Sequence, residues 1–172
     1  PHMLPKFRAS GVAGTVGAAA TGARMYGLDV EKTMHALGAA ACFAHGFGQG
    51  FLSGSTEVKL NVGMASRQGL SAAILAKLGA TASPVAFEGD VGYFRAFSGT
   101  ADNAEAATRD LGTHYLIQDT VYKECPICIF TQTPVALAKQ IAPQIDASKI
   151  ERIVLTSPDL TYTNPGFLNN KP

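Results

Sequence analysis

Histidine and lysine side chains are the first groups in this sequence that could do chemistry. His45 directly precedes the glycine-rich run G-F-G-Q-G-F-L-S-G-S at residues 46–55. A histidine at a helix end beside glycine is typical of a general acid or base, and equally of a helix C-terminal cap, so both interpretations stay open. Lys59 and Lys123 are cations that could grip a carboxylate, with a solvated surface lysine as the alternative for each.

Other candidate motifs carry less chemistry. His114 lies at a predicted strand start and is a weaker binding candidate, whereas His35 lies off its helix's apolar stripe and is expected in solvent. Cys125 and Cys128 form a C-x-x-C that no helix follows directly, so we expect a structural role. No second cysteine pair or i, i+4 histidine pair is present, which disfavours a metal site. The glycine-rich run follows a helix and lacks a P-loop lysine, which excludes both nucleotide-binding motifs.

The composition of the chain argues against several classes of protein function. The chain has 172 residues, a formal net charge of +1, 47% hydrophobic and 16% charged residues. These values predict one ordinary domain, with or without a small appendage, and exclude a disordered chain. Without a basic run or a long apolar stretch, we expect neither a nucleic-acid partner nor a membrane span. Three cysteines without disulfide spacing favour a reducing, cytoplasmic location.

Hydrophobic periodicity, and glycines that end helices, predict the secondary-structure elements that position these residues. The pattern predicts helices over residues 11–26, from Asp29 onward, over 64–78, from Ser83-Pro84, over 102–111 and from Thr133-Pro134, a loop over 46–55, and strands over 113–124 and 150–156. The predicted fold class is therefore α+β. A helical part over residues 1–112 precedes a β-α-β lid-like part over 113–172.

Small residues dominate the first three predicted helices. Alanine and glycine let helix backbones approach closely, so we expect these helices to pack face to face. They offer few large side chains to seal a core, which predicts association with a second copy as a homodimer.

Five motifs of this sequence, in this order along the chain, are similar to motifs of a known protein family. They are F-R-A-S-G-V-A-G-T-V-G-A-A-A-T-G-A-R-M-Y-G-L-D (7–29), K-L-N-V-G (59–63), E-G with Gly92, Phe94 and Phe97 (88–97), Y-K-E-C-P (122–126) and I-E-R-I-V-L-T-S-P-D-L-T-Y-T-N (150–164). Together they resemble the MmgE/PrpD family of 2-methylcitrate dehydratases and cis-aconitate decarboxylases. The resemblance implies a helical domain interrupted by a smaller α/β lid, and a dimer that works without metal or cofactor. It also implies a shortened member without the N-terminal half of the helical domain.

The resemblance assigns roles to particular residues. It implies elimination of water or CO2 from small tricarboxylates between the domains. The family's pocket lysine falls on Lys123, its lid tyrosine on Tyr162 and its K-x-L-H lysine nearest Lys59. Arg8, Asn61 and Gln132 stand where the family has histidines, which removes acid and base groups while cationic and phenolic groups remain.

Three functions are compatible with this pattern. The first is a cofactor-independent cyclase or pericyclase of an apolar metabolite, with Arg8, Lys123 and Tyr162 as donors and a wall of Phe43, Phe47 and Phe51. The second is a dehydratase or decarboxylase of a small carboxylic acid, with His45, His114 or Tyr162 moving the proton. The third is a non-catalytic module or a fragment of a longer enzyme. Lys59, Asn61 and Gln132 complete the set of predicted substrate-binding residues.

Overall fold

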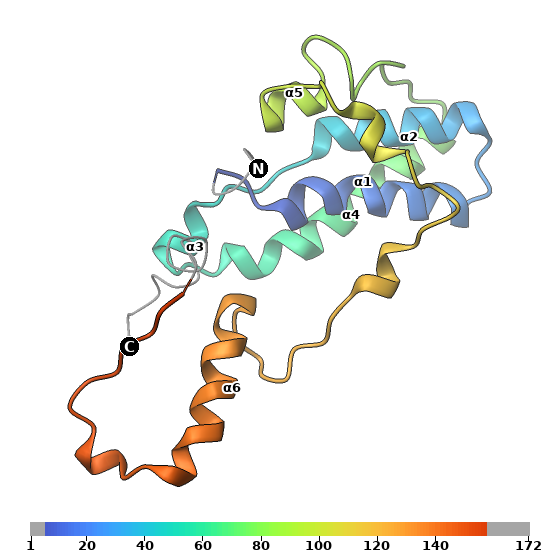
Figure 1. Ribbon diagram of the computed structural model, residues 1–172. Helices are drawn as coiled ribbons and strands as arrows, with labels where there is room; N and C mark the ends of the chain where they lie inside the picture. Colours follow the sequence, from blue (N-terminus) through green and yellow to red (C-terminus); the bar gives the residue numbers. More distant parts are fainter. Residues whose placement is uncertain (1–5, 158–172) are drawn as a thin grey trace. The chain divides into compact units, whose positions relative to one another are not determined.

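The chain folds into two compact units, Pro1–Thr113 and His114–Pro172. The computed structural model describes residues 6–157, so that Tyr162 lies outside the described residues. Nearly all regular structure among the described residues is helical (Figure 1).

Three long helices build the first unit. They are α1 (Ala9–Met25), α2 (Val30–Phe43) and α4 (Glu57–Lys77), and each packs against the other two (Figure 1). The Asp29 side chain accepts a hydrogen bond from the Lys32 backbone N–H at 2.8 Å, which confirms the predicted cap of α2. Two short helices, α3 (Gln49–Ser53) and α5 (Tyr93–Ser98), and a 3-10 turn, η1 (Ala104–Ala107), complete the unit.

Alanine forms most of the core between these helices. Its two clusters of buried residues are Ala23, Ala36, Ala73 and Ala76, and Ala19, Ala40 and Ala72. The largest fully buried side chains in the described part of the chain are only Val12 and Thr15. The predicted face-to-face packing of small-residue helices is therefore confirmed.

Gly69 marks the closest approach of α1 and α4. A methyl group added there would collide with the Thr15 carbonyl oxygen and come within 2.5 Å of the Ala18 Cβ. One turn further along, a methyl on Gly22 would lie 2.9 Å from the Ala73 Cβ. The two helix backbones can therefore meet only because both positions lack a side chain.

The second unit corrects the predicted fold class. It contains α6 (Gln132–Ile141) and four 3-10 turns, η2 (Leu116–Asp119), η3 (Ile129–Thr131), η4 (Ala142–Gln144) and η5 (Ala147–Lys149). Residues 6–157 contain no β-strand, so the predicted α+β class with a β-α-β lid is wrong. Ile150 has an extended backbone, but Ile153 and Val154 are 81% and 70% exposed. A strand needs a partner for its backbone N–H and C=O groups, and the described residues supply none here.

Three shorter predictions also differ from the structure. Residues 46–55 contain α3 rather than loop alone. The predicted helix at Ser83-Pro84 is a series of turns, and helix begins again only at Tyr93. Residues 102–111 form one 3-10 turn instead of an α-helix. Each is a short segment, and the local sequence pattern determines the secondary structure of short segments least.

Within residues 6–157, no helix is long and apolar enough to cross a membrane.

Gly69→Ala tests the contact between α1 and α4. We expect a loss of about 1–3 kcal/mol in the free energy of unfolding, because the added methyl has no space. Gly63→Ala on the same helix is the matched control, since a Cβ there meets nothing within 4 Å. It should stabilise by about 0.5–1 kcal/mol through helix propensity. Urea unfolding measures both, and equal effects of the two variants would contradict the close approach.

Candidate active site

The segment before α1 lies alongside the segment after α2. The Arg8 N–H donates to the Gly46 carbonyl at 2.9 Å, and the Gly48 N–H donates to the Lys6 carbonyl at 2.8 Å. Phe7 and Phe47 form an isolated antiparallel bridge between these two hydrogen bonds. The pairing fixes Arg8 beside the turn at residues 45–46.

Asn61 approaches the same turn from the first turns of α4. It is 8% exposed and therefore one of the few buried polar residues of the described chain. A methyl on Gly46 would lie 3.0 Å from the Arg8 Cβ and 3.6 Å from the Asn61 Cγ. Gly46 also has a φ of +105°, which disfavours any side chain there. This glycine therefore lets Arg8 and Asn61 come together across the turn.

His45 lies within this group of residues. Its carbonyl oxygen packs against Gly11 of α1 so closely that a methyl group on Gly11 would collide with it. The His45 Nδ1 lies 3.2 Å from the Phe43 carbonyl, which can only accept a hydrogen bond. This contact assigns the proton of the neutral ring to Nδ1 and leaves a lone pair on Nε2. Nε2 is buried and has no hydrogen-bond partner among residues 6–157.

Aromatic rings support the Arg8 side of the group. The Phe7 ring lies 6.2 Å from that of Phe47 and 5.0 Å from that of Phe97, and Phe97 in turn lies 4.9 Å from Tyr93. This series of contacts ties the segment before α1 to α5. Burial of the phenol raises the pKa of Tyr93 to about 12.

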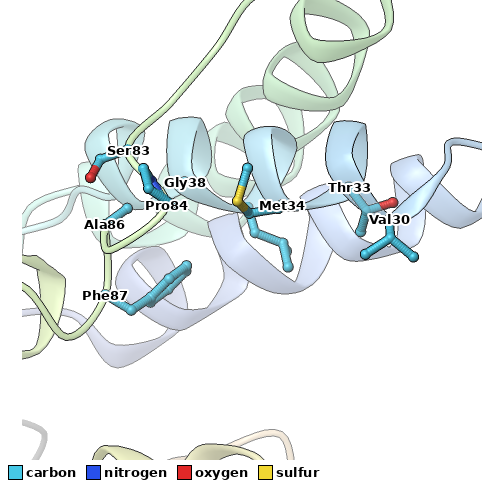
Figure 2. Close-up of a pocket in the computed structure, with 9 residues that line it drawn as sticks. Val30, Thr33, Met34, Gly38, Ser83, Pro84, Ala86 and Phe87 are labelled. Carbon is cyan, nitrogen blue, oxygen red and sulfur yellow. The ribbon is translucent and has the colours of Figure 1, made fainter.

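A separate apolar hollow lies on α2, and neither Arg8, His45 nor Asn61 lines it. It has a volume of about 290 Å³ and is lined by Val30, Thr33, Met34, Leu37, Gly38, Ser83, Pro84, Ala86 and Phe87 (Figure 2). A methyl on Gly38 would lie 2.8 Å from the Ala82 Cβ, so the facing segment packs tightly on the helix. The sequence analysis did not predict this hollow, because its far side comes from a turn over 40 residues away.

His35 of α2 contacts the backbone of the segment that faces this helix. Its Nδ1 lies 3.1 Å from the Ala82 nitrogen and 3.2 Å from the Ala82 oxygen, and the residue is half-buried. The prediction that His35 is solvated is therefore wrong. Its partner lies 47 residues away in sequence, and no local pattern reports such a contact.

Comparison with known proteins identifies the family. The profile of the MmgE/PrpD N-terminal domain matches residues 2–106, well over half of the chain. The chain belongs to the MmgE/PrpD family. Cis-aconitate decarboxylase of Homo sapiens is 26% identical over 96% of the chain, and that of Mus musculus is 30% identical over 95%. The chain spans 35% of the length of each relative. No solved structure matches it.

The remaining candidate residues in the first unit of this MmgE/PrpD family member have different surroundings. Lys59 is exposed in the first turn of α4. Phe43 packs against the alanine core at the end of α2, and Phe47 is 74% exposed. Phe51 belongs to α3, but its side chain lies outside the described part of the structure. Phe43 therefore belongs to the edge of the core, whereas most of Phe47 faces solvent.

Three candidates belong to the second unit and are described there alone. Lys123 is exposed in an irregular segment. The His114 Nε2 lies 2.8 Å from an Asp119 carboxylate oxygen on the same surface turn. The Gln132 side chain bonds the backbone of Cys125 and Ile127 and therefore positions a turn. Among residues 6–157, no three His, Cys, Asp or Glu side chains gather to hold a metal ion.

Tyr93→Phe tests the buried phenol that supports the Arg8 segment. The unfolded chain loses the tyrosine proton near pH ~10, whereas the folded chain holds it until about pH 12. This contribution to stability is complete below pH ~10 and is lost as the pH rises through the folded-state pKa. Urea midpoints at pH 9, 10 and 11 should therefore fall less steeply for Tyr93→Phe than for the wild type. Tyr115→Phe, at a residue 58% exposed, is the control. Identical slopes for all three proteins would contradict the burial.

Proposed function

We propose that this chain forms part of a lyase site that acts on a small di- or tricarboxylic acid. The observation that carries the proposal is the His45 Nε2, a buried lone pair without a partner among the described residues, on the residue directly before Gly46, which both Arg8 and Asn61 approach. The similarity to cis-aconitate decarboxylases supports the reaction class. Because the chain spans about a third of those relatives, the substrate and the activity are inferences of ours.

Elimination of water or CO2 beside a carboxylate needs a proton carrier and groups that stabilise negative charge. In the proposed dehydration, the Nε2 of His45 takes the proton from the carbon next to a carboxylate while the C–O bond breaks, and the hydroxyl leaves as water with a proton from solvent. In the proposed decarboxylation, the C–C bond breaks and releases CO2, and an Nε2 that has first taken a proton from solvent delivers it to the carbon. The Arg8 guanidinium pairs with a substrate carboxylate, since its planar donors match two oxygens. The Asn61 amide adds a neutral donor for charge that develops in the transition state.

Burial of Nε2 sets a condition on this chemistry. A substrate reaches that nitrogen only when the atoms that now cover it are displaced. Exclusion of water then strengthens each electrostatic contact in the site. We assign this opening to the glycine-rich residues 46–54, which begin directly after His45 and contain Gly46 and Gly54 at positive φ.

The cyclase hypothesis is the weaker of the two catalytic alternatives. It needs an apolar wall, and Phe43 is committed to the helical core while Phe47 is largely exposed. No other described feature favours it over the lyase. A lyase site also explains why a histidine, an arginine and an asparagine gather at one turn.

His45→Gln tests the proposed proton carrier. We expect kcat with cis-aconitate or 2-methylcitrate to fall about 10²–10⁴-fold, because glutamine keeps hydrogen bonding but cannot accept the proton. KM should change little, whereas Arg8→Gln should mainly raise KM through the lost carboxylate contact. Absorbance of the conjugated alkene and mass spectrometry of the products report turnover.

His35→Gln is the matched control for this measurement. His35 is also a half-buried histidine on a backbone contact, but its partner is Ala82 instead of a residue of the proposed site. It should keep the wild-type kcat. Equal loss in both variants would show that the effect is structural. If the chain neither turns over nor binds either acid, by absorbance and by calorimetry, the lyase proposal is wrong.

A further inference from the structure

The C-x-x-C motif contains a thiol in direct contact with a cation. The Nζ of Lys139, on α6, donates a hydrogen bond to the Sγ of Cys125 at 3.1 Å. Cys125 and Cys128 are both half-buried and both free thiols. Within residues 6–157, neither Cys128 nor Cys42 has a comparable contact from a lysine or arginine. The motif is therefore asymmetric, and Cys125 has an electrostatic partner that the other cysteines lack.

Gln132 holds the backbone that presents this thiol. Its Oε1 accepts from the Cys125 N–H at 3.2 Å, while its Nε2 donates to the carbonyls of Cys125 at 2.8 Å and Ile127 at 3.2 Å. The Ile127 N–H also donates to the Cys125 carbonyl at 2.8 Å. Gln132 and Lys139 lie on the same helix. One helix therefore fixes both the position of the thiol and the ammonium group beside it.

This arrangement affects the reactivity of sulfur. The thiolate is the nucleophilic form of cysteine, and an adjacent ammonium stabilises it. The pairing is also visible at the other partner, since the hydrogen bond to Cys125 is the main cause that raises the pKa of Lys139. The Glu124 carboxylate contributes to the same pKa in the same direction.

We propose that Cys125 is a reactive thiol, activated by Lys139, that undergoes exchange with small-molecule disulfides. The Cys125 thiol releases its proton to solvent, and the thiolate attacks one sulfur of the disulfide. The disulfide's own S–S bond breaks as the bond to Cys125 forms. The departing thiolate takes up a proton, so the small disulfide is the oxidant and one of its halves is released as a thiol.

Such an exchange is a modification site in its own right and does not depend on the proposed lyase activity. The added group takes the place of the Lys139 ammonium at sulfur, and the charge pair is lost. Lys123, which the sequence predicts as a catalytic residue, lies two residues before Cys125, so the modified thiol lies close to it along the chain.

Single-cysteine proteins and the neutral reagent 4,4′-dithiodipyridine test the proposal. The Cys125-only protein carries Cys42→Ser and Cys128→Ser, and the Cys128-only protein carries Cys42→Ser and Cys125→Ser. Release of 4-thiopyridone at pH 7 gives the exchange rate, and peptide mass mapping of the wild type gives the site. We expect Cys125 to react about tenfold faster than Cys128.

Variants of Lys139 separate activation from exposure. In the Cys125-only protein, Lys139→Met should lower the rate at pH 7 several-fold and shift the rise of the rate to higher pH, while Lys139→Arg should keep most of it. Lys149→Met is the matched control, because it removes the same charge from the same unit at a lysine paired with Asp146. Equal rates for Lys139→Met and Lys149→Met, or faster labelling of Cys128, would overturn the proposal. Circular dichroism confirms that each variant is folded.

Discussion

The contact between α1 and α4 at Gly69 is the constraint on which the first unit depends. A methyl group at Gly69 would meet the backbone of α1, so the two helix axes are held at a separation that only glycine permits. Arg8 directly precedes α1, and Asn61 lies in the second turn of α4. Their meeting at the turn of Gly46 is therefore a consequence of helix packing. The geometry of the polar site therefore depends on a core made mostly of alanine, in which Val12 and Thr15 are the largest fully buried side chains of the described residues.

A core of this kind buries little apolar surface per residue. The larger apolar side chains remain exposed in the described structure, among them Leu60 and Leu78 of the α4 region at 62% and 79%. Exposed apolar surface of this extent is typical of a face that another chain or domain covers. The predicted homodimer is compatible with this surface and stays a prediction. The same surface fits the finding that the chain spans 35% of each curated relative.

The sequence predicted those parts of the fold that depend on local pattern. The three long helices follow from apolar periodicity and glycine stops, and the Asp29 cap follows from one side chain and a nearby N–H. The strand at residues 150–156 was wrong because strand pairing is not local. Its alternating side chains give extended backbone at Ile150, but the described chain offers no partner strand. The sequence likewise indicated which single residues could do chemistry, but it did not predict which of them lie together in the structure. Arg8, His45 and Asn61 were candidates by type, and only packing brings them to one turn. Cys125 was predicted to be structural because no helix directly follows the C-x-x-C, and that local pattern does not report its contact with Lys139, which lies 14 residues away.

Two histidines show why residue type alone does not decide a role. The Nδ1 of His35 faces both the nitrogen and the oxygen of Ala82, so it finds a partner whether or not it carries a proton. The Nδ1 of His45 faces only the Phe43 carbonyl, which requires a proton there and leaves the Nε2 lone pair unused. A buried acceptor without a partner costs stability, of the order of 1–3 kcal/mol. A fold tolerates such a cost where the group serves another purpose, and a histidine that must accept a proton is one. The backbone contacts therefore distinguish the two rings, since His35 within α2 is satisfied in either state, whereas His45 just after α2 keeps the unpartnered Nε2 on which the proposed role depends.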